Sequence, residues 1–70
     1  MKTQAKVYAS DESYDIVGHI MDYESGQLPE AQSIELFQRL INNGMAFQLQ
    51  GHYGRTAMRL IARGLCVAAS

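Results

Sequence analysis

The chain has little of several residue types that direct small proteins toward particular chemistries. It contains one cysteine, one proline and no tryptophan. A single cysteine, Cys66, excludes an internal disulfide, and no Cys or His spacing matches a metal-binding motif. We therefore expect neither a cofactor nor a metal. The near-absence of cysteine also fits a reducing compartment, so we expect a cytoplasmic location.

Long hydrophobic runs are absent as well. The opening stretch, MKTQAKVYASDES, has no apolar run of the length found in signal peptides. No segment approaches the roughly 20 apolar residues of a membrane span, so we expect no membrane association. The net charge is −1, and bulk charge therefore favours neither nucleic acid nor an acidic partner.

What remains is the composition of a small folded domain. The chain has 70 residues, of which 47% are hydrophobic and 19% charged. A chain of this size has room for one core and little room for a deep substrate cavity. We expect a flexible N-terminal arm at residues 1–10, one helical domain at 11–66 and a C-terminal tail at 67–70.

Hydrophobic periodicity predicts the fold class. Apolar residues recur at helical spacing over residues 11–24, from Pro29 to about residue 42, and from about 53 to 63. Proline suits the first helical position because that residue's N–H has no intrahelical partner. The segment 45–50 is apolar but short. The sequence therefore predicts an all-α fold, a bundle of three amphipathic helices plus one short helical turn.

Three local features carry structural expectations. The short turn is expected to pack into the core through Met45, Phe47 or Leu49. Gly18 is costly inside a helix and suggests close packing by another helix or another subunit. Glu35 and Arg39 stand four residues apart in the order that favours an ion pair on a helix.

The charges are distributed asymmetrically along the chain. All seven acids lie between Asp11 and Glu35, and the charged residues that follow are all arginines. Arg55, Arg59 and Arg63 recur every fourth residue and so form one stripe on the last helix. Either this stripe pairs with the acidic faces of the earlier helices, or it meets an anionic surface on another molecule.

The helical wheel places this stripe opposite the apolar side of residues 53–63. Tyr53, Ala57, Leu60 and Ile61 share the apolar side, which makes a solvated charged face the ordinary interpretation. A helix-turn-helix is an alternative, with residues 53–63 as its recognition helix. The intervening segment is longer than the usual tight turn of that motif.

Nucleophiles and bases are too scattered to suggest catalysis. His19 follows Asp15 by four residues, which favours an ordinary surface ion pair. His52 lies in a turn bracketed by glycines, and Cys66 lies near an end expected to fray. The glycine-rich turn lacks the lysine and the preceding strand of a phosphate loop. We therefore expect no enzymatic activity.

Methionines at helix edges add adaptable apolar surface. Met21 and Met58 are examples, and Met58 is expected to be exposed. Small helical domains with spare apolar edges often complete their core by pairing, so a homodimer is one expected state.

Several motifs resemble a family of very short proteins common in tailed-bacteriophage genomes. The pattern is YESG, then LFQRLI, then LQGHYGRTA and LIARGL, and it spans roughly Tyr14 to Cys66. YGRTA is its specific part. The resemblance implies a phage product working inside a bacterial host, and it carries no activity, cofactor or catalytic residue.

These observations together favour a protein-binding module that occupies the surface of a host or phage protein. We expect the contact surface to comprise His52, Tyr53, Arg55, Arg59 and Arg63, because interfaces are enriched in arginine and tyrosine. The alternative is a nucleic-acid-binding regulator using the helix at 53–63.

Overall fold

The computed structural model describes residues 14–69 as an all-helical fold. The elements are α2 (Ile16–Glu24), α3 (Glu30–Asn42), the 3-10 turn η1 (Met45–Phe47) and α4 (Gly51–Ala62). The predicted class, three helices with one short helical turn, is confirmed for these residues. The expected arm at 1–10 and the first three residues of the predicted 11–24 helix lie outside the described residues.

Helix α2 begins later than the periodicity predicted. Asp15 is its N-cap, and the Asp15 carboxylate accepts a hydrogen bond from the backbone N–H of Gly18 at 3.0 Å. Aspartate is among the best N-caps because its side chain satisfies an N–H that has no helical partner. The prediction that Tyr14 lies inside this helix is therefore wrong.

The same cap explains Gly18. A Cβ atom at this position would collide with the Asp15 carboxylate. Within this chain the tight neighbour of Gly18 is thus the helix's own cap and not another helix.

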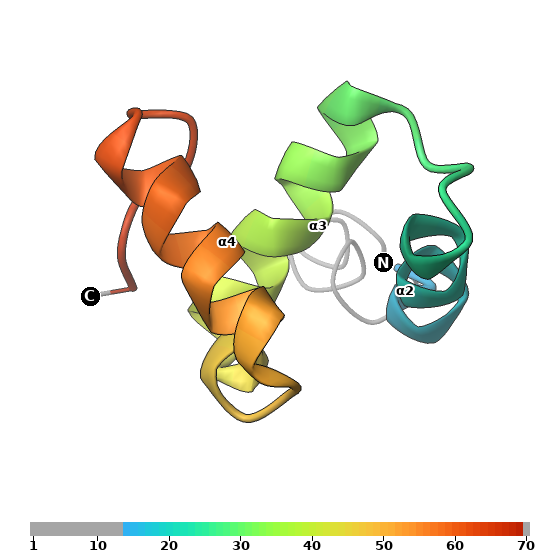
Figure 1. The fold of residues 1–70 in the computed structure, drawn as a ribbon, viewed down its shortest axis with the longest axis horizontal. Coiled ribbons are helices and arrows are strands. Elements are labelled where there is room, and N and C mark those ends of the chain that lie inside the picture. Colours follow the sequence, from blue (N-terminus) through green and yellow to red (C-terminus); the bar gives the residue numbers. More distant parts are fainter. Residues whose placement is uncertain (1–13, 70) are drawn as a thin grey trace, which may run out of the picture.

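The hydrophobic core is built around α3, which lies between α2 and α4 (Figure 1). Pro29 was predicted to be the first helical residue. It is instead the N-cap of α3, so the helix begins one residue later, at Glu30. At the other end, Gly44 has φ 81° and redirects the chain into η1, a conformation that costs glycine little. The buried side chains come from α3, η1, α4 and the following segment: Leu36, Phe37, Leu40, Ile41, Ala46, Tyr53, Ala57 and Cys66.

The 3-10 turn η1 places an unexpected residue in the core. Ala46 is fully buried, Met45 and Leu49 are half-buried, and Phe47 is 53% exposed. The small Ala46 lets α4 approach, and a Cβ at Gly54 would lie 3.6 Å from the Ala46 carbonyl oxygen. The turn therefore does not pack into the core through Phe47.

The chain after α4 folds back against α3. Cys66 is buried, and its thiol donates to the Ile34 carbonyl oxygen at 3.6 Å. The Gln38 side-chain amide donates to the Val67 carbonyl oxygen at 2.9 Å and accepts from the Val67 N–H at 2.8 Å. The expectation that Cys66 lies at a fraying end is therefore wrong, because Gln38 pairs with the backbone immediately after it.

Candidate functional site: the exposed face of α4

Helix α4 separates a buried side from a strongly basic side. Tyr53 and Ala57 face the core, while Arg55, Arg59 and Arg63 are all exposed. We refer to these three arginines, with the neighbouring His52, as the arginine face. Within residues 14–69 none of the three arginines makes an ion pair. The first explanation of the charge asymmetry, internal pairing with the acidic helices, thus has no support in the described residues.

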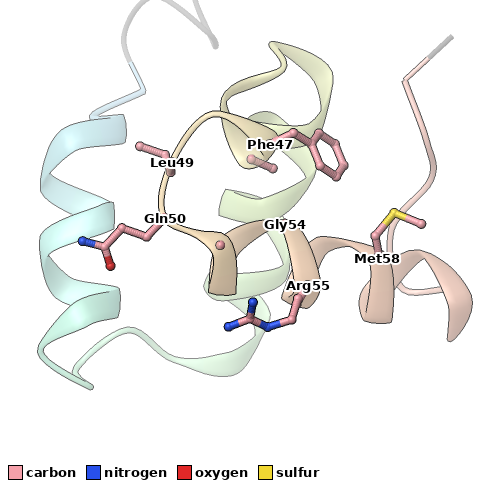
Figure 2. Close-up of a pocket in the computed structure, with 8 residues that line it drawn as sticks. Phe47, Leu49, Gln50, Gly54, Arg55 and Met58 are labelled. Atoms are coloured by element: carbon pink, nitrogen blue, oxygen red, sulfur yellow. The ribbon is translucent and has the colours of Figure 1, made fainter.

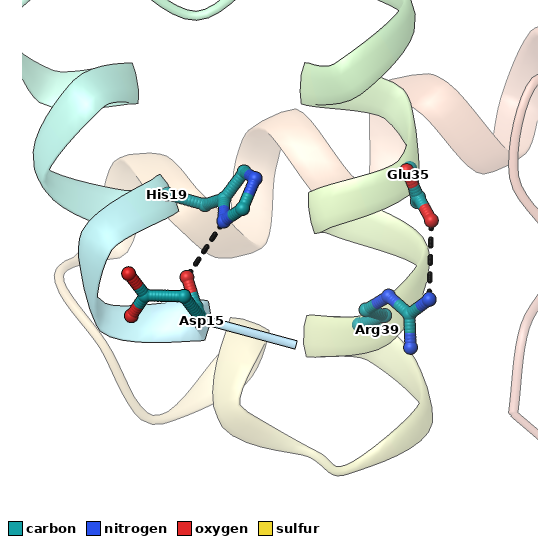
Figure 3. Close-up of polar contacts among 4 residues, drawn as sticks. All are labelled: Asp15, His19, Glu35 and Arg39. Carbon is teal, nitrogen blue, oxygen red and sulfur yellow. Dashed lines mark hydrogen bonds and ion pairs between the residues drawn. The ribbon is translucent and has the colours of Figure 1, made fainter. Parts of the chain in front are cut away.

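An ion pair between described residues lies within α3. Arg39 Nη2 is 3.1 Å from Glu35 Oε2, as the four-residue spacing predicted (Figure 3). The Arg39 guanidinium also lies over the Tyr14 ring, 4.1 Å from its centroid. Burial raises the pKa of Tyr14, and the negative charge of Glu35 adds to this effect. Arg39 therefore connects α3 to the residue that precedes α2.

Two acidic side chains at the ends of α2, those of Asp15 and Glu24, have local or structural roles. His19 Nδ1 lies 2.6 Å from the backbone carbonyl oxygen of Asp15 (Figure 3), and its ring stacks on Tyr14. The predicted surface ion pair of His19 with the Asp15 carboxylate is therefore wrong. The Asp15 carboxylate caps the helix instead, and Glu24 accepts a hydrogen bond from Tyr53.

Tyr53 occupies the centre of the core rather than the outer surface. Its side chain is 1% exposed, and its hydroxyl donates to Glu24 Oε2 at 2.6 Å. Its ring stacks on Phe37 with the centroids 5.7 Å apart, and Tyr23 packs beside both. Burial, followed by the hydrogen bond to Glu24, raises the pKa of Tyr53 well above its ordinary 10.0. Tyr53 is therefore not available to a partner, although it was predicted as a contact residue.

His52 stands at the boundary between the core and the arginine face. It is half-buried, and its ring centroid is 4.4 Å from that of Tyr53. The structure thus brings His52 and the three arginines to the outer side of one helix and separates Tyr53 from them.

An apolar hollow adjoins the arginine face, and the sequence did not reveal it. We call it the Phe47–Met58 hollow; its volume is about 500 Å³, and Figure 2 shows the side chains around it. Met58 is 56% exposed, as its edge position predicted. Of the described residues in the lining, Arg55 carries the charge. The hollow is lined by side chains of η1, the following segment and α4, including Phe47, Leu49, Gln50, Gly54, Arg55 and Met58 (Figure 2).

The described residues offer little for covalent or metal chemistry. In residues 14–69 no group of three or more His, Cys, Asp or Glu side chains is placed to bind a metal ion. Burial raises the pKa of the Cys66 thiol, which disfavours the reactive thiolate. No helix in this part of the chain has both the length and the apolar character to span a membrane.

Comparison with protein-family models matches residues 12–70 to a domain of unknown function, DUF7417. The chain belongs to this family. No curated protein and no solved structure matches the chain. The DUF7417 match covers all three described helices, the arginine face and the Phe47–Met58 hollow, so these features lie within the family's domain.

Proposed function

We propose that this DUF7417 protein is a phage-encoded binding module that occupies an acidic surface of a host or phage protein in the bacterial cytoplasm. The observation that carries the proposal is the arginine face. Three arginines are exposed on one helix and have no acidic partner within residues 14–69. Such a surface gains free energy when it meets carboxylates on another molecule.

Two further features favour a protein over a nucleic acid as the partner. Met58 adds exposed apolar surface on the same helix, and protein interfaces combine arginine with apolar anchors. In addition, residues 43–50 separate α3 from α4. This connection is longer than the turn of three or four residues in a helix-turn-helix, which weakens the recognition-helix alternative.

The experiment is affinity capture from a bacterial lysate with the tagged protein, with and without nuclease. The test variant is Arg59→Ala/Arg63→Ala, and the matched control is Glu30→Ala/Gln32→Ala, which changes two exposed residues of α3. We expect one protein to be retained after nuclease treatment by the wild type and by the control, and lost by the test variant.

Two outcomes contradict the proposal. Retention by the test variant at the wild-type level excludes the arginine face as the contact. Retained material that disappears with nuclease supports the nucleic-acid alternative, and its affinity should then fall steeply as the salt concentration rises.

A further inference from the structure

The surface around Phe47 and Met58 is apolar and uncovered in one copy of the chain. The two side chains are 53% and 56% exposed. They also line a second hollow of about 400 Å³ that extends toward Ile41 and Ile61. Among residues 14–69 no acidic side chain lines either hollow, and Arg55 supplies the charge at the edge. A matching occupant therefore presents apolar side chains with a carboxylate beside them.

Helix α2 of the same chain carries this combination. Val17 and Met21 are 63% and 64% exposed, and they stand one helical turn apart. Asp22 follows Met21 directly and is also exposed. The helix Ile16–Glu24 contains two acids and no lysine or arginine. Its outer surface is thus apolar and acidic, whereas the hollow is apolar and basic.

We propose that α2 of one copy docks in the Phe47–Met58 hollow of a second copy. A helix typically enters a groove through side chains spaced four residues apart, which Val17 and Met21 provide. Asp22 lies about 100° around the helix from Met21, to the side of this pair, and we assign it to Arg55 at the edge of the second copy's hollow.

The charges argue against the two symmetric alternatives. Contact between the hollows of two copies brings two Arg55 side chains together, and no acid of the described residues lies in either lining. Helix α2 against α2 brings acids such as Asp22 together. Juxtaposed like charges disfavour both arrangements, so the contact joins different surfaces of the two copies.

This inference does not depend on the proposed function. Helical spacing places Arg59 and Arg63 farther around α4 from the hollow than Arg55. Self-association therefore leaves these two arginines accessible to another partner, and an Arg59→Ala/Arg63→Ala variant is expected to self-associate like the wild type.

The test is sedimentation equilibrium of the full chain over a wide range of concentrations. The hollow variant is Phe47→Ser/Met58→Ser, and the helix variant is Val17→Ser/Met21→Ser; all four side chains are exposed. Circular dichroism establishes that both variants remain helical. We expect the wild type to self-associate and each variant alone to be monomeric.

The decisive measurement is the equal mixture of the two variants. The hollow variant keeps an intact α2, and the helix variant keeps an intact hollow, so one contact can form and the mixture should stop at a one-to-one complex. A wild type that stays monomeric throughout overturns the proposal. So does self-association of either variant alone, or a mixture that stays monomeric.

Charge exchange provides a second readout. Asp22→Arg and Arg55→Asp should each weaken self-association by about two- to fivefold, the size expected for a surface pair. Mixing the two variants should restore the affinity, because each contact between one variant and the other again joins an acid to an arginine. Absence of restoration contradicts the assignment of Asp22 to Arg55.

Discussion

Helix α2 and the unit formed by α3, η1 and α4 are held by different kinds of contact. The α3–η1–α4 unit contributes most of the fully buried side chains, whereas α2 contributes none. Helix α2 packs through half-buried residues such as Ile20 and Tyr23, and its Glu24 accepts a hydrogen bond from Tyr53 of α4. One part of the molecule is thus stabilised mainly by burial, and the other by aromatic edges and hydrogen bonds.

This difference indicates where the protein tolerates change. Apolar burial is collective, so the loss of one core side chain weakens the whole unit. Contacts such as the hydrogen bond between Tyr53 and Glu24 are individual, and water can replace part of what is lost. Helix α2 should therefore open at a lower free energy than α3.

The largest effect is expected from Phe37→Ala. This side chain is buried between α2 and α4, and its loss should lower the free energy of unfolding by about 3–5 kcal/mol. Phe47→Ala is the matched control when both chains are kept dilute enough to be monomeric, because the same change at an exposed side chain should then cost within about 0.5 kcal/mol. Urea denaturation measures both, and equal losses would contradict the assignment of Phe37 to the core.

A smaller effect is expected from Tyr53→Phe. The change removes the hydroxyl that donates to Glu24 and keeps the ring, so the expected loss is about 1–2 kcal/mol. Hydrogen exchange should show the loss of protection mainly in α2. Tyr23→Phe is the control, because the Tyr23 hydroxyl makes no hydrogen bond in the described residues. Loss of protection spread evenly over α3 and α4 would show that the bond does not serve α2 in particular.

The same substitution should change the response to alkaline pH. The pKa of Tyr53 is raised in the folded state, so an unfolded chain loses this proton first, near pH 10. The protonated Tyr53 therefore contributes to the free energy of unfolding below about pH 10, and this contribution is lost as the pH rises above that value. Urea denaturation at pH about 8 and about 11 should show a shallower decline for Tyr53→Phe than for the wild type. Some decline should persist, because the pKa values of Tyr14 and Cys66 are also raised.

Gln38→Ala tests the contact that closes the larger unit. Two hydrogen bonds to Val67 are lost, and solvent can replace them, so the expected cost is about 0.5–1.5 kcal/mol. The Cys66 thiol should react faster with an alkylating reagent, because the segment around it opens more often. Gln32→Ala, at an exposed position of the same helix, should leave the rate unchanged.

The smallest effect is expected from Glu35→Gln. The pair with Arg39 is on the surface of one helix, and its loss should cost at most about 0.5 kcal/mol. The difference from the wild type should shrink at high salt, where the charges are screened. A loss above about 1 kcal/mol would indicate that Glu35 also fixes Arg39 against Tyr14 and thereby supports α2.

The sequence predicted the helices and the exposure of the three arginines, because both follow from the spacing of apolar residues along one helix. It did not predict the start of α2. A polar residue such as Asp15 fits the polar side of a longer helix as well as it fits an N-cap, and periodicity does not distinguish the two. It also did not decide which of Met45, Phe47 and Leu49 would pack the short turn into the core.

Contacts between residues far apart in the sequence could not be predicted, for a different reason. Tyr53 and Glu24, like Gln38 and Val67, are 29 residues apart. Their meeting depends on how the helices cross, and periodicity within one helix carries no information about that angle. Helical spacing puts Gln38 on the polar side of α3, where a glutamine typically contacts only water. The Phe47–Met58 hollow likewise requires η1 and α4 to be placed together.

The fold-back of the chain after α4 has a consequence for proteolysis. Arg63 is exposed and precedes Gly64, where φ is 77° and the chain leaves the helix. A protease that cuts after arginine would sever the backbone between α4 and Cys66, which belongs to the core. A single cut at this point would thus remove a core side chain and uncover the side of α3 at Ile34 and Gln38, although most of the polypeptide would remain intact.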